Sequence, residues 1–142
     1  MLPLVKRILQ ALIESGTIRQ GVFPTSADAV AAAAVTLTAD AAAWTWGVYT
    51  QIVAAAGVLV ETQIEGFTLE NFVGGPLQGE VIIASGAGAA EVELGRWPVN
   101  NALFHLPKPI RVPPLTRLAC AFRSSTVVAD TVDIKLLTTT GF

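Results

Sequence analysis

Short runs in which apolar and polar residues alternate, separated by glycine and proline, constrain the fold of this chain more than any other feature. About eight such runs follow one another after residue 30, with turn signals roughly every 8–15 residues. Successive side chains of a β-strand point to opposite faces, so a period of two residues predicts strands with one buried face. We therefore predict an all-β fold, an antiparallel, jelly-roll-like β-sandwich of about eight strands.

The positions of the tryptophans and of Tyr49 in the sequence predict whether their side chains are buried or exposed. In residues 43–53, Trp44 and Trp46 fall on the same strand face as apolar neighbours, so we expect both indoles to anchor the core. Tyr49 falls on the opposite face of the same strand. Trp97 precedes Pro98 and is expected in a loop, where it is free to contact another subunit or a ligand.

The other alternating runs predict further strands and one irregularity. Gly66 interrupts its run and predicts a β-bulge. Val92 and Leu94 alternate with glutamates, so we expect both to point inward. The alanine-rich stretch 28–43 has high helix propensity, but valine and threonine alternate at residues 35–38 and favour a strand there.

A proline-rich segment follows His105. Pro107, Pro109 and Pro113 cannot belong to a central strand, because proline lacks the N–H that a sheet ladder requires. We expect this segment to be an extended loop or an edge strand. A stiff segment loses little entropy on ordering, so these three prolines, together with Trp97, are candidate inter-subunit or ligand contacts.

The first 20 residues follow a helical period instead of a strand period. Their apolar residues form one stripe of an amphipathic helix, which consists of Val5, Ile8, Leu9, Leu12 and Ile13. We expect a helical arm over residues 1–20, a linker over 16–26 and a β-sandwich domain over 21–142. The stripe either packs on the chain's own sandwich or attaches the chain to a neighbouring subunit or another protein, because a helix of this length is marginal alone.

Charged residues are scarce, at 14% of the chain against about 25% in typical soluble domains. A surface with so little charge suggests that other chains cover part of it. The net charge of −2 and the lack of a basic stretch argue against a nucleic-acid partner. No membrane span or signal peptide is recognisable, so we expect synthesis inside the cell and no membrane partner.

Few residues are available for catalysis. The chain has one histidine, His105, and one cysteine, Cys120, which excludes an internal disulfide and a cysteine-based metal cluster. We expect His105 to be a hydrogen-bonded residue at a strand end and Cys120 to be a small core residue. The strand glutamates are expected on solvated faces and not as a glycosidase pair: Glu61, Glu65, Glu91 and Glu93. We therefore expect no enzymatic activity, no metal and no cofactor.

Three stretches are similar to a known class of virion proteins: residues 36–53, Glu91–Arg96 and Arg117–Ser125, the last followed by a final strand. In composition and order, they resemble the small jelly-roll-like head decoration (cement) proteins of tailed bacteriophages, over about residues 30–138. The resemblance implies a structural virion protein that is made in the host cytoplasm and binds the major capsid protein at the capsid surface. It also implies a homotrimer and carries over no catalytic residue.

A second interpretation stays open beside this one. The chain would then be a receptor- or glycan-binding module of a phage tail or head fibre, with Trp97 and Tyr49 at the ligand. Binding to a glycan array distinguishes this module from a decoration protein.

Overall fold

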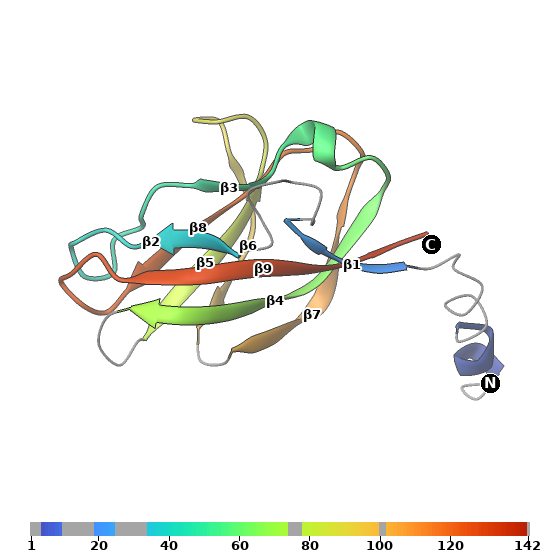
Figure 1. Cartoon of the computed structure of the whole chain (residues 1–142), viewed down its shortest axis with the longest axis horizontal. Helices are drawn as coiled ribbons and strands as arrows, with labels where there is room; N and C mark the ends of the chain where they lie inside the picture. Colours follow the sequence, from blue (N-terminus) through green and yellow to red (C-terminus); the bar gives the residue numbers. More distant parts are fainter. Residues whose placement is uncertain (1–3, 10–18, 25–33, 74–77, 100–101, 142) are drawn as a thin grey trace.

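A computed structural model describes residues 4–9, 19–24, 34–73, 78–99 and 102–141 of the chain (Figure 1). These residues contain a short helix at 4–9 and nine strands, which confirms the expected all-β sandwich with an N-terminal helix. A single 3-10 turn, η1 (Ala55–Gly57), precedes β4. The strands are β1 (Arg19–Phe23), β2 (Val35–Thr38), β3 (Thr50–Val53), β4 (Thr62–Val73), β5 (Gly79–Ser85), β6 (Val92–Pro98), β7 (Leu103–Val112), β8 (Leu118–Ser124) and β9 (Thr131–Thr140).

The strands divide between two antiparallel sheets. Sheet A has the order β1-β9-β4-β7, with β2 also paired to β9, and sheet B has the order β3-β8-β5-β6. β2 pairs with the first part of β9 and β1 with its last part, so two short strands share one edge of β9. From β2 to β9, the chain passes between the sheets in the pairing order of an eight-stranded jelly roll.

The core lies between the two sheets. Every second residue of β9 and β8 is fully buried, as the alternating pattern predicts: Val132, Ile134 and Leu136 in β9, and Leu118, Cys120 and Phe122 in β8. Aromatic contacts also join the sheets. The ring centroid of Phe67 lies 5.2 Å from that of Phe104 in sheet A and 6.2 Å from that of Trp97 in sheet B.

The predicted bulge at Gly66 is confirmed. The pairing of β4 with β7 shifts register between Ile64 and Gly66, whose partners are Ile110 and His105. Residues 106–109 of β7 therefore lie opposite a single residue of β4. Gly66 is required at this point, because an added Cβ would lie 2.2 Å from the carbonyl oxygen of Phe104.

The proline-rich segment belongs to an edge strand, which is one of the two expected outcomes. β7 is the last strand of sheet A, and Pro107 and Pro109 fall in the part that the register shift leaves unpaired. Both prolines are exposed, as is Pro113 just after the strand. Their missing N–H groups therefore remove no ladder hydrogen bond.

Two sequence-based assignments near strand ends are wrong. β1 begins at Arg19, so residues 19–23 of the expected linker form a strand that pairs with β9. Val92 and Leu94 are exposed instead of inward, because β6 is an edge strand whose register shifts opposite Ile83 and Ala84. The register shift interrupts the alternation of inward and outward side chains in β6.

Hydrogen bonds to one side chain connect three strands of sheet A. Thr36 of β2 donates to Asp133 of β9 at 2.5 Å, and Asn71 of β4 donates to the other carboxylate oxygen at 2.8 Å. These two bonds hold the pKa of Asp133 below its usual value. The strand expected at 35–38 is confirmed, and the described part of the alanine-rich stretch, residues 34–43, contains no helix.

Candidate functional site

Trp44 and Trp46 lie on the outer face of sheet B, so the expectation that they anchor the core is wrong. The segment that contains them runs beside β8. The N–H of Trp44 donates to the carbonyl oxygen of Ser124 at 2.7 Å, and the N–H of Gly47 donates to that of Phe122 at 2.9 Å. Trp44 has a left-handed backbone, with a φ of 57°, and is 44% exposed.

Gly47 allows this segment to approach β2 closely. A Cβ added to Gly47 would lie 1.8 Å from the carbonyl oxygen of Thr38 and 3.3 Å from the Cα of Ala39. Both obstacles are backbone atoms, so a larger residue requires the chain itself to move. Because Gly47 is adjacent to Trp46, this contact sets where the indole lies on sheet B.

Two arginines stack on the indoles. The Cζ of Arg123 lies 4.6 Å from the ring centroid of Trp46 and 5.6 Å from that of Trp44, and the Cζ of Arg96 lies 5.6 Å from that of Trp46. Distances below about 6 Å are typical of cation–π interactions, which contribute about 0.5–1 kcal/mol each at exposed sites. We call Trp44, Trp46, Arg96 and Arg123 the Trp–Arg cluster.

Carboxylates hold both guanidinium groups in place. Arg123 donates to Glu80 at 3.0 Å, and Arg96 donates two hydrogen bonds to Glu93 at 2.7 and 2.8 Å. The bonds from Arg96 lower the pKa of Glu93, and Glu93 in turn raises the pKa of Arg96. The contacts within this face therefore order the cluster.

Small and aliphatic side chains lie on the same outer face of sheet B. Ile82 of β5 pairs with Ala121 of β8 on one side and with Arg96 of β6 on the other. Ala84 and Ala119 form the next pair along the same two strands. These four aliphatic residues are at most 4% exposed, although they alternate with the residues that face the core. The larger polar and aromatic side chains of the face cover them.

A polar network borders the cluster on this face. Arg117 donates to Glu91 at 3.0 Å, to Gln51 at 2.9 Å and to the carbonyl oxygen of Gly86 at 3.0 Å. The side chain of Glu91 is 8% exposed, so it is not the solvated residue that the sequence predicts. A backbone hydrogen bond, followed by the bond from Arg117, lowers the pKa of Glu91. Burial raises the pKa of the neighbouring Tyr49.

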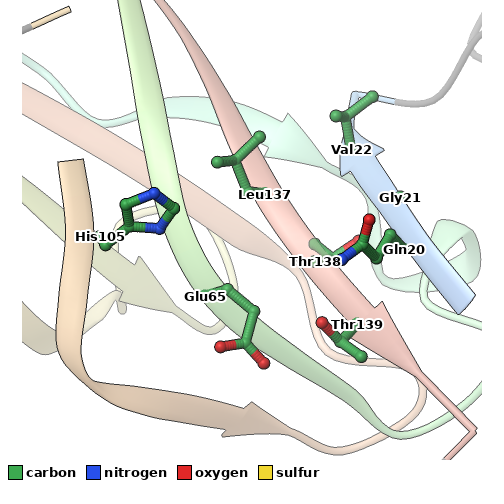
Figure 2. Close-up of a pocket in the computed structure, with 8 residues that line it drawn as sticks. All are labelled: Gln20, Gly21, Val22, Glu65, His105, Leu137, Thr138 and Thr139. Atoms are coloured by element: carbon green, nitrogen blue, oxygen red, sulfur yellow. The ribbon is translucent and has the colours of Figure 1, made fainter. Parts of the chain in front are cut away.

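A separate hollow of about 480 Å³ lies on sheet A (Figure 2). It is lined by residues of β1, β4, β7 and β9: Gln20, Gly21, Val22, Glu65, His105, Leu137, Thr138 and Thr139. Figure 2 shows the carboxylate of Glu65 extending away from the ring of His105, so the two side chains do not form an acid–base pair. His105 is an exposed residue within β7 and not at its end.

The single cysteine faces the core. Cys120 is fully buried, which raises the pKa of its thiol and confirms the expected role as a small core residue. Among the described residues, no three His, Cys, Asp or Glu side chains gather closely enough to hold a metal ion. Glu61 is an accessible residue, as expected, and pairs with Arg111 at 3.6 Å.

The candidate contact residues have different surroundings. Trp97 belongs to β6, not to a loop, and packs partly buried against the core through Phe67, so it is not free as expected. Of the arm stripe, Val5, Ile8 and Leu9 lie in the helix at 4–9 and are exposed. Leu12 and Ile13 lie outside the described residues.

Within the described part of the chain, no helix is long and apolar enough to cross a membrane. Comparisons with protein-family models and with curated proteins found no match to this chain. Two surfaces of the described structure are candidate functional sites: the Trp–Arg cluster on sheet B and the hollow on sheet A.

Proposed function

We propose that the protein is a structural decoration protein of a bacteriophage-type capsid and that it binds the head surface through the Trp–Arg cluster. The observation that carries the proposal is the placement of two indoles and two guanidinium groups together on the outer face of a sheet. Tryptophan and arginine are among the residues most enriched at the positions that dominate binding energy in protein interfaces.

The order of the cluster supports this use. Glu80 and Glu93 fix the two arginines by hydrogen bonds, so a partner would not have to immobilise these flexible side chains. Immobilising a rotamer-rich side chain costs about 0.5–1.5 kcal/mol on binding. Because the arginines are already ordered, binding a partner avoids this cost and the affinity is higher.

Exposed apolar residues elsewhere support contacts with several neighbouring chains, as a subunit of a surface lattice requires. The most exposed of them lie in connections between strands: Val48, Leu59, Leu115 and Val127. Each of these four is at least 71% exposed. Burying such a side chain fully against a neighbouring subunit is favourable by about 1.5–3 kcal/mol.

Binding of the purified chain to phage heads tests the proposal. The chain is incubated with purified heads of a phage that encodes it, and bound protein is measured by co-sedimentation. Trp44→Ala is expected to weaken binding about thirtyfold or more, the effect of a hot-spot residue that contributes about 2 kcal/mol.

Phe72→Ala is the matched control, because Phe72 is also aromatic and is 42% exposed, close to the 44% of Trp44. It lies in β4 of sheet A, outside the cluster. An absence of binding to heads, or equal losses for the two variants, contradicts the proposal.

A second candidate function follows from the exposed ring of Trp44, since an accessible indole can stack on a sugar. The chain would then be a glycan-binding module of a phage fibre, with Trp44 in the role that was expected of Trp97. Glycan-array binding that is lost in Trp44→Ala, without binding to heads, favours this function.

A further inference from the structure

The apolar side chains in the described part of the N-terminal helix, residues 4–9, are uncovered. Leu4, Val5, Ile8 and Leu9 are 47–58% exposed, and Figure 1 shows the helix set apart from both sheets, beyond the start of β1. Fully burying a valine, leucine or isoleucine side chain stabilises a protein by about 1.5–3 kcal/mol relative to leaving it in water. Four such side chains exposed on one short helix are therefore costly. The stripe therefore favours a surface to cover it.

The hollow on sheet A offers such a surface. Val22 pairs with Leu137 across β1 and β9, and these two residues bring aliphatic groups to its lining. Val22 is 41% exposed. A cavity of about 150 Å³ admits a group the size of benzene, so the volume of 480 Å³ admits about three side chains of that size.

The charges around the stripe and the hollow are complementary. With about 100° between successive helix residues, Lys6 and Arg7 fall on either side of the apolar stripe. Glu65 lines the hollow. Within the described residues, none of these three side chains forms an ion pair. A stripe that enters the hollow thus brings an unpaired cation towards an unpaired carboxylate.

We propose that the helix at residues 4–9 of one copy docks in the sheet A hollow of a second copy, so that copies of this chain are joined by exchanged arms. Residues 10–18 connect the helix to β1, and nine residues span at most about 30 Å. β1 lines the hollow, so each copy carries its arm at the border of its own hollow, within reach of an adjacent copy.

Exchange between copies is favoured over docking on the same chain because the stripe stays exposed in the structure of a single chain. The contact joins two different surfaces, a helix and a hollow, so repeated exchange closes into a ring when the rotation between copies allows it. This proposal uses sheet A and the arm, whereas the proposed capsid contact uses sheet B. The two proposals therefore stand independently.

Two full-length variants separate the arm from the hollow. Ile8→Asp places a charge in the stripe, and Val22→Asp places a charge in the hollow. Both positions are exposed, at 53% and 41%. Each variant alone is expected to self-associate at least tenfold more weakly than the unmodified chain, measured by analytical ultracentrifugation at micromolar concentration. Circular dichroism checks that the β signal is retained.

A mixture of the two variants gives the decisive result. The Val22→Asp chain still has an intact arm and the Ile8→Asp chain still has an intact hollow, so the mixture is expected to form a 1:1 heterodimer. Val127→Asp is the matched control, because Val127 is 75% exposed and lies in the connection between β8 and β9, away from the end of β9 that lines the hollow.

Three results would overturn the proposal. The first is that the unmodified chain is monomeric at micromolar concentration. The second is that Ile8→Asp and Val22→Asp associate as strongly as Val127→Asp. The third is that the mixture of the two variants forms no heterodimer. The first result includes the case in which each arm occupies the hollow of its own chain.

Discussion

Replacement of Gly47 by alanine tests whether the contact between this segment and β2 positions the Trp–Arg cluster. The added Cβ lies 1.8 Å from the carbonyl oxygen of Thr38, and real Cβ atoms do not approach within 3.0 Å. The segment therefore has to move by at least 3.0 − 1.8 = 1.2 Å. Such overpacking against backbone costs about 1–3 kcal/mol.

We expect Gly47→Ala to lower the free energy of unfolding by this amount in urea titrations followed by circular dichroism. The displacement also moves Trp46 relative to Arg123, whose Cζ lies 4.6 Å from its ring centroid, so we expect the tryptophan fluorescence of the folded protein to change. Gly88→Ala is the matched control, because an added Cβ at Gly88 has no atom within 4 Å.

The control is expected to change stability by no more than about 0.5 kcal/mol. If Gly47→Ala unfolds at the same urea concentration as Gly88→Ala and has unchanged fluorescence, then Gly47 does not hold the segment against β2. The claim that this close contact positions the Trp–Arg cluster would then be refuted.

Three other outcomes follow from the same contacts. Arg123→Met removes two stacking contacts and an ion pair, so it should lower the free energy of unfolding by about 1–2 kcal/mol. Lys135→Met removes one accessible ion pair at 3.7 Å and should change the free energy of unfolding by less than about 0.5 kcal/mol. Urea titrations of the two variants test this difference. Cys120 should not react with Ellman's reagent until the protein is unfolded, since the thiol is buried and its pKa is raised; rapid reaction in native buffer would show that the core is accessible. The pKa of Asp133 is lower in the folded protein than the ordinary value of 3.8, so this carboxylate stabilises the fold at pH values above 3.8. The stabilisation is lost as the pH falls through the pKa of the folded state. Asp133→Asn should therefore lose less stability on acidification than the unmodified chain, and an unchanged acid profile would contradict this role.

The sequence patterns that predicted the fold correctly are those in which alternation and burial coincide. The first six residues of β9, 131–136, alternate between polar and apolar, and Val132, Ile134 and Leu136 are fully buried, so both the strand and its buried face follow from the pattern. Gly66 also follows from the sequence, since a glycine that interrupts an alternating run typically marks a bulge. β1 does not, because its five residues lack such a pattern and pair with residues more than 110 positions later.

The Trp–Arg cluster could not be predicted in the same way. Alternation shows that Trp44 and Trp46 share a face, but it cannot show which face meets the core. That choice depends on Arg123, which is 79 residues beyond Trp44, and on Arg96 from a strand at the far edge of sheet B. One signal was present: Arg123 alternates with core residues such as Phe122 in β8, which places a cation on the outer face of a central strand.

The central claim, that the outer face of sheet B docks on a capsid, is tested most directly by cryo-electron microscopy of phage heads saturated with the purified chain. We expect density for the sandwich on the head surface, with Trp44, Trp46 and Arg123 at the contact with the major capsid protein. Density in which the outer face of sheet B is directed to solvent would contradict this claim.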